Sequence, residues 1–215
     1  MKNSGSRLLS TAIAIASFVS VSLAQFEGSI EFKKMTTTDT TKYIYYIKEN
    51  KVRIDEIGSK SKQITGTFLV DLDASTMQAL NTDRKLYMDK RPGTPETLIG
   101  TPEITKTKET KTLLGTNCKE FVVANKAENT TIKYYVGGSK FDFFRKFLKF
   151  MNRKDKSSEY FLLLKDAGDG FPYLSIQTDN TGKETGRLEV VKMEKKVIDP
   201  VMFEIPKEYK KFEMN

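Results

Sequence analysis

The residues that could carry out chemistry in this chain are few, and its neighbouring carboxylates are the first candidates. Asp71 and Asp73 flank a short turn, and Asp55 is followed directly by Glu56. Two carboxylates about 5–10 Å apart across a cleft would suit glycoside hydrolysis. Asp is common beside turns for conformational reasons alone, and nothing in the spacing places a second acid opposite either pair. We therefore predict no catalytic residue here.

The chain has one Cys, Cys118, and no His. This composition excludes Ser-His-Asp and Cys-His catalysis, histidine ligation of zinc and an internal disulfide. Cys118 precedes an apolar stretch, and no His or second Cys is present to activate it. We expect a buried structural thiol and a protein that is not an enzyme.

One acidic turn resembles part of a calcium-binding loop, since Asp166 and Asp169 precede Gly170. It lacks the regularly spaced oxygen ligands and the closing Glu of such loops. We predict a Gly/Asp turn there, with no metal and no cofactor.

The element expected to position any site is a helix over Ser139–Met151. Ser139 is the predicted N-cap, and Asp142 follows three residues later. At about 100° per residue, the apolar side chains fall on one half of the helix. They are Phe141, Phe143, Phe144, Phe147, Leu148, Phe150 and Met151.

Three roles are open for this helix: a core helix, a helix that lines or gates an apolar cavity, or an interfacial membrane helix. If it lines a cavity, the ligand lies between helix and sheet and touches Phe144, Phe147 and Met151. Nucleic-acid binding is not expected, because the aromatic residues and the cations occupy opposite halves of the helix.

Most of the remaining chain alternates apolar and polar residues, as half-buried strands do. Residues 157–167 fit either a second helix or a strand, and 91–102 form the longest expected loop. No β-α-β rhythm appears. The predicted fold is α+β: a strongly curled antiparallel sheet of about ten strands, a half barrel, whose concave face is covered by one or two late helices.

Residues 1–24 have the features of a cleaved signal peptide. Lys2 and Arg7 precede an apolar run, and Ser22-Leu23-Ala24 supplies the small residues of a cleavage site. We expect a single domain over 25–215 without a transmembrane segment, exported to the periplasm or secreted. The full chain carries a formal charge of +8, which fits either exposed Lys on a β-protein or attraction to an anionic lipid or polysaccharide.

Several short motifs, in order along the chain, resemble a family of exported proteins of Bacteroidota-type bacteria with a domain of unknown function. They are Phe26-Glu27-Gly28, Tyr45-Tyr46-Ile47-Lys48, Lys51-Val52-Arg53, Asp71-Leu72-Asp73, Lys85-Leu86-Tyr87-Met88, Leu114-Gly115 with Cys118, Gly170-Phe171-Pro172, and Phe203-Glu204-Ile205-Pro206 followed by Tyr209. That family is similar to periplasmic lipoprotein carriers, which hold acyl chains between a half barrel and its helices. The resemblance implies no catalytic or ligand residues.

The function we predict is that of an exported, non-enzymatic protein that binds a lipid or a lipoprotein acyl chain between sheet and helix. The alternative is an envelope or secreted interaction protein with a filled core, whose partner is another envelope protein. A cavity of several hundred Å³ beneath the helix would favour the first.

Overall fold

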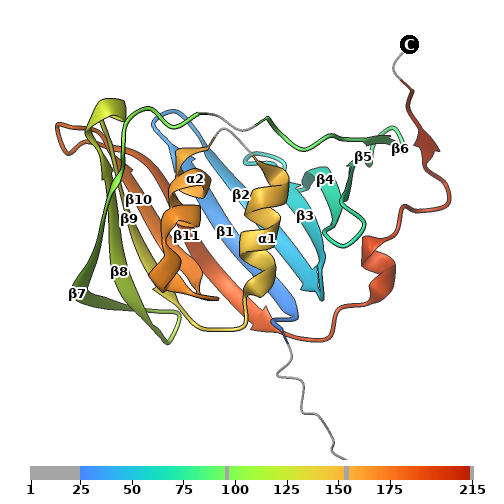
Figure 1. The fold of residues 1–215 in the computed structure, drawn as a ribbon. Coiled ribbons are helices and arrows are strands. Elements are labelled where there is room, and N and C mark those ends of the chain that lie inside the picture. Colours follow the sequence, from blue (N-terminus) through green and yellow to red (C-terminus); the bar gives the residue numbers. More distant parts are fainter. Residues whose placement is uncertain (1–24, 95–96, 153–154, 214–215) are drawn as a thin grey trace, which may run out of the picture.

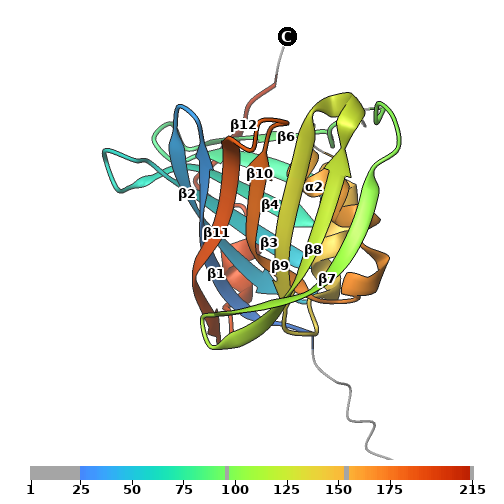
Figure 2. The same cartoon turned by 90° about the vertical axis from the view of Figure 1, so that its left-hand side faces the viewer.

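The computed structural model describes residues 25–94, 97–152 and 155–213. The predicted signal peptide, 1–24, lies outside the described residues. The described chain forms one sheet, with two α-helices packed against one of its faces (Figures 1 and 2).

The sheet has twelve strands in the order β12-β6-β5-β4-β3-β2-β1-β11-β10-β9-β8-β7. Their bounds are β1 Gly28–Thr36, β2 Thr40–Lys48, β3 Lys51–Ile57, β4 Ile64–Asp71, β5 Thr76–Asn81, β6 Leu86–Asp89, β7 Glu103–Leu113, β8 Thr116–Asn125, β9 Thr130–Gly137, β10 Phe171–Thr178, β11 Glu184–Lys195 and β12 Lys210–Lys211. All neighbours pair antiparallel except β12 and β6.

The chain reaches both edges of the sheet before its last long strand, β11, pairs with β1 in the middle of the sheet. Strands β1 to β6 run outward to one side, and the segment between β6 and β7 then crosses to the other edge (Figure 1). Strands β7 to β11 run back inward, so that β11 pairs with β1 at the centre.

The coarse part of the predicted fold is confirmed: the protein is mostly β, with a mostly antiparallel sheet and two late helices. Twelve strands replace the expected ten or so, partly because the two-residue β12 pairs in parallel with β6. The sheet is neither closed nor strongly curled, and its order ends in β12 on one side and β7 on the other. The predicted half barrel is therefore not confirmed.

The main helix, α1, spans Asp142–Met151, and α2 spans Lys156–Leu163. The predicted start of α1 at Ser139 is wrong. Lys140 has a left-handed backbone with φ of 71°, and its N–H donates to Asp169 Oδ2 at 2.7 Å. The N–H of Phe141 donates to the Asp169 carbonyl at 3.0 Å. The turn at Asp169 therefore holds the chain out of the helix until Asp142.

The core lies between the helices and the face of the sheet that they cover. Five side chains of α1 are buried: Phe143, Phe144, Phe147, Leu148 and Met151. They meet inward positions of the strands such as Ile30, Ile47 and Val52, which are all fully buried. The inward-facing apolar side chains of the strands thus pack against the apolar side of α1, as the sequence pattern predicts.

Candidate functional site

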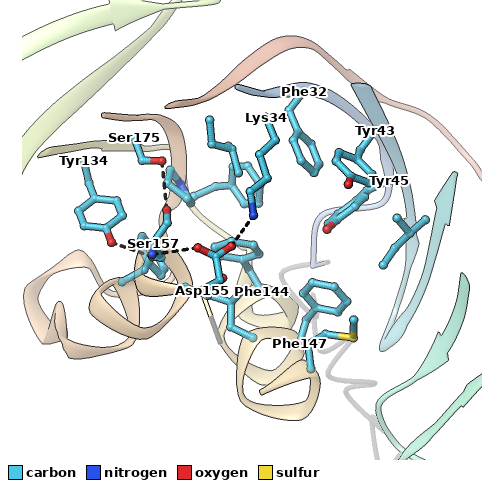
Figure 3. A pocket seen from close by; sticks show the side chains of 18 of the residues that line it. Phe32, Lys34, Tyr43, Tyr45, Tyr134, Phe144, Phe147, Asp155, Ser157 and Ser175 are labelled. Carbon is cyan, nitrogen blue, oxygen red and sulfur yellow. Dashed lines mark hydrogen bonds and ion pairs between the residues drawn. The ribbon is translucent and has the colours of Figure 1, made fainter. Parts of the chain in front are cut away.

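A cavity of about 300 Å³ lies between the helices and the sheet. Most of the side chains that line it are apolar or aromatic. They are Phe32, Lys34, Tyr43, Tyr45, Ile54, Glu56, Phe68, Tyr134, Phe144, Phe147, Leu148, Met151, Asp155, Ser157, Ser158, Phe161, Phe171, Pro172, Ser175 and Leu188. Figure 3 shows the sheet residues on one side and the helix residues on the other.

All three residues predicted to touch a ligand line this cavity: Phe144, Phe147 and Met151. They lie on α1 at spacings of three and four residues, which places them on one side of the helix. The ring of Phe144 also contacts Phe171 of β10, with 4.5 Å between centroids. The structure thus brings the predicted residues together around one space.

The sheet side of the cavity is built from aromatic residues of β1 and β2. Phe32 stacks on Tyr43, with centroids 5.4 Å apart, and meets Tyr45 edge-on at 4.7 Å. Phe32 and Tyr43 are cross-strand partners, and Tyr45 is two residues along β2 on the same face. These three rings form an aromatic wall in which each ring contacts a neighbouring ring.

One side of the cavity is polar and follows the start of α2 (Figure 3). Asp155 is the N-cap of α2: its Oδ1 accepts from the N–H of Ser157 at 3.1 Å. Its Oδ2 accepts from Lys34 Nζ on β1 at 2.8 Å. The Ser157 hydroxyl lies 3.2 Å from that of Ser175 on β10.

A buried phenol completes this polar side. Tyr134 of β9 donates to the Ser157 carbonyl at 2.7 Å, and its ring is 1% exposed. Burial raises the pKa of Tyr134 well above its ordinary value, so the phenol remains a neutral donor. Together with Lys34 and Ser175, it ties the start of α2 to three different strands.

A second polar cluster lies at the end of β8 and is centred on Glu128. This carboxylate accepts from Lys156 Nζ at 2.6 Å, from the Tyr160 hydroxyl and from the Ile99 N–H at 3.3 Å. Burial opposes its ionisation, but these donors outweigh burial and hold the pKa of Glu128 below its ordinary value. Because Glu128 is satisfied by donors from α2 and the β6–β7 connection, we assign the cluster a structural role.

Three of the acidic residues considered from the sequence, Asp55, Asp71 and Asp169, have structural partners. Asp71 Oδ1 accepts from the N–H groups of Asp73 and Ala74 in their turn. Asp55 is 2% exposed and bonds Arg53 and Thr67. Asp169 fixes the entry to α1. Across residues 25–94, 97–152 and 155–213, no group of three or more His, Cys, Asp or Glu could hold a metal ion.

Cys118 is fully buried on β8. Burial raises the pKa of its thiol to about 11, so almost none of it is thiolate at neutral pH. This environment agrees with the predicted structural role.

Sequence reasoning missed four polar residues of the cavity: Lys34, Asp155, Ser157 and Ser175. A signal for Lys34 was present, since it has the same parity on β1 as the inward-facing Ile30 and Phe32. No comparable signal marks Ser175, whose partner lies on a helix that packs against it only in the folded chain.

No helix among the described residues is both long enough and apolar enough to cross a membrane.

Solved structures that match this chain share little sequence identity with it. An uncharacterised conserved protein from Thermus thermophilus has a TM-score of 0.52 at 9% identity, covering 86% of this chain and 88% of its own. PNGF-II has a TM-score of 0.43 at 15% sequence identity, and the match covers 89% of this chain and 31% of PNGF-II. A DUF1329 family protein from Desulfovibrio piger has a TM-score of 0.36 at 9% sequence identity, and the match covers 84% of this chain and 90% of that protein.

The likeness to the Thermus protein extends to the fold alone. Among curated proteins, none matches this chain. The sequence model of one family matches residues 26–209, which is most of the chain. The protein therefore belongs to the DUF4412 family, a domain of unknown function.

Proposed function

We propose that this protein is an exported, non-enzymatic binding protein for an apolar ligand, such as a lipid or an acyl chain, held between α1 and the sheet. The observation that carries the proposal is the cavity of about 300 Å³ that Phe144, Phe147 and Met151 line. This volume is at the lower end of the range of small-molecule sites, roughly 300–1,000 Å³. It is about twice an engineered cavity of roughly 150 Å³ that binds benzene, so it has room for a dozen or so carbon atoms.

Two further observations support the proposal. Two late helices on one face of a mostly antiparallel sheet fit part of the arrangement that the sequence resemblance to lipoprotein carriers implies. Export follows from the features of residues 1–24, with the mature protein in the periplasm or secreted.

The test uses a property of the sequence: the chain contains no Trp. Phe147→Trp introduces a single indole into the cavity wall, and Phe150→Trp is the matched control on the same helix, outside the cavity lining. We expect 1-dodecanol to change the emission of Phe147→Trp saturably and to leave Phe150→Trp unchanged. Native mass spectrometry of protein from an exporting host should detect co-purified lipid.

Calorimetry on the unmodified protein guards against a reporter that folds badly. If 1-dodecanol produces neither heat nor an emission change, and no lipid co-purifies, the ligand-binding function is rejected.

An interaction protein is the second candidate, and the edge strand β7 favours it. Nine of its eleven residues are exposed, and one side of the strand has no neighbour in the sheet. A partner could add a strand there, as in β-augmentation. The Lys residues of β7 also fit a simpler role, because charges on an edge strand prevent unwanted pairing.

A further inference from the structure

We propose that the ligand is a single-chain amphiphile with an anionic head, and that Lys34 binds this head in competition with Asp155. The inference rests on the proposed function, since it concerns the same cavity. It adds a head-group class and a specificity-determining residue.

Lys34 lies in the lining of the cavity, where it can meet the head of a bound ligand. It is the single Lys or Arg among the described residues that line the cavity. Its side chain is 42% exposed and points across the cavity toward the start of α2 (Figure 3). The aromatic wall lies directly beside it, because Lys34 follows Phe32 on the inward face of β1. A chain buried against these rings would therefore have its head at Lys34.

Lys34 and Asp155 differ in how many further hydrogen bonds their charged groups can form. An ammonium group has three donors, and Asp155 Oδ2 takes one of them. The carboxylate of Asp155 is already engaged at both oxygens, by Ser157 N–H and by Lys34. Lys34 can thus donate a hydrogen bond to a ligand oxyanion, whereas Asp155 is poorly placed to bind a cationic head.

Lys34 can leave Asp155 for a ligand oxyanion with little loss of stability. The Lys34–Asp155 pair is partly exposed, with side-chain exposures of 42% and 25%. Such pairs contribute little to stability, so transfer of Lys34 to a ligand oxyanion is inexpensive. Asp155 keeps its N-cap bond through Oδ1 during this exchange, and α2 therefore remains intact.

A second carboxylate, Glu56, also lines the cavity and would repel an anion. It belongs to β3, which is separated from the Lys34 strand by β2. Glu56 is therefore a useful control, since its neutralisation removes one negative charge from the cavity without releasing Lys34 from its partner.

The experiment is calorimetry at pH 8, below the micelle concentration, with four ligands of one chain length: dodecanoate, dodecyl phosphate, 1-dodecanol and dodecyltrimethylammonium. We expect at least one of the two anions to bind about tenfold more tightly than the alcohol, as a charge-assisted hydrogen bond allows. Preference for the phosphate would indicate a lipid head group, and preference for dodecanoate a free fatty acid. Lys34→Met should remove the preference, so that the anions bind this variant no more tightly than the alcohol does.

Asp155→Asn tests the competition, because Asn caps a helix as well as Asp does. It should tighten anion binding more than Glu56→Gln does. Equal effects of the two variants would reject competition for Lys34. Equal affinity of the unmodified protein for all four heads, or tightest binding of the cation, would reject the anionic head and leave the apolar site standing. No binding of any of the four would reject the proposed function itself.

Discussion

Phe147 of α1 meets Tyr45 of β2 edge to face, with ring centroids 5.5 Å apart. This contact joins the helix to the sheet across the cavity, and it leaves part of the Phe147 ring facing open space. Phe143, one turn earlier on α1, is fully buried and does not line the cavity.

The first prediction compares these two Phe residues. Phe143→Ala should lower the free energy of unfolding by about 3–5 kcal/mol, because it opens a void in a filled core. Phe147→Ala should cost less, since its ring already lacks packing partners on the cavity side. Urea unfolding measures both, with exposed Lys149→Gln on the same helix as a control expected within about 0.5 kcal/mol. Equal losses for the two Phe variants would contradict the cavity.

The second prediction concerns Gly28, where β1 lies against β11. Its φ is +152°, and an added Cβ would lie 2.0 Å from the Glu194 carbonyl oxygen. Gly28→Ala should therefore destabilise the protein by more than about 1 kcal/mol. Gly66 on β4 is the matched control, since a Cβ there meets nothing within 4 Å. Thermal unfolding in which Gly66→Ala proved the more damaging would show that the β1–β11 contact is wrongly placed.

The third prediction is a pH dependence from Glu128, whose side chain is 6% exposed. Its folded pKa lies below the ordinary value, so the unfolded chain binds the proton first as pH falls. The stability it contributes is present above the unfolded pKa of about 4.3 and is lost as pH falls through the folded pKa.

Glu128→Gln should therefore be less stable than the unmodified protein at pH 7, by about 1–3 kcal/mol, and should lose less stability on acidification. Denaturant midpoints between pH 7 and pH 3 measure this. Glu184→Gln, which breaks a surface pair with Arg187, should move the midpoints far less. Parallel pH profiles for unmodified protein and Glu128→Gln would exclude the carboxylate as the source.

The fourth prediction follows from the burial of Cys118. With no exposed surface and a thiol pKa of about 11, it should label slowly with a thiol reagent in the native state. It should label rapidly in denaturant, where its pKa returns to about 8.5. Native labelling at the denatured rate would place the thiol at the surface.

The fifth prediction is that the mature protein begins at Gln25. Phe26 is 3% exposed, and its N–H donates to the Lys140 carbonyl at 2.8 Å, so the residue next to the expected N-terminus is packed into the fold. Intact mass of the protein from an exporting host decides it. A mass that includes residues 1–24 would contradict cleavage there.

The sequence predicts the helix side of the site better than the sheet side. The arc of Phe144, Phe147 and Met151 follows from helical periodicity, which is local. The partners of that arc depend on which strands pair, and β1 meets β11 across more than 140 residues, as Gly28 opposite Lys195 shows. Alternation assigns Lys34 to the inward face, but only the folded chain brings Asp155 to it.

The same limit explains the error at Ser139. A serine before an apolar arc predicts an N-cap, yet the helix begins at Asp142 because Asp169 holds Lys140 and Phe141. Asp169 follows Ser139 by thirty residues and belongs to a turn that sequence alone assigns no partner. Competition from a distant hydrogen-bond acceptor overrides a local capping preference.

The central position of β1 has a consequence for how this chain folds. The strand pairs within β2 to β6, within β7 to β9 and between β10 and β11 form from neighbouring segments. Strands β9 and β10 are separated by the two helices, and β1 must wait for β11 before its second edge is paired. Long-range pairing of this kind is slow, because the loop between the strands loses entropy before any contact forms. The cavity takes Phe32 and Tyr45 from one half of the sheet and Ser175 and Leu188 from the other. It can therefore form only after β1 and β11 have paired, so a chain that ends before β11 does not contain this cavity.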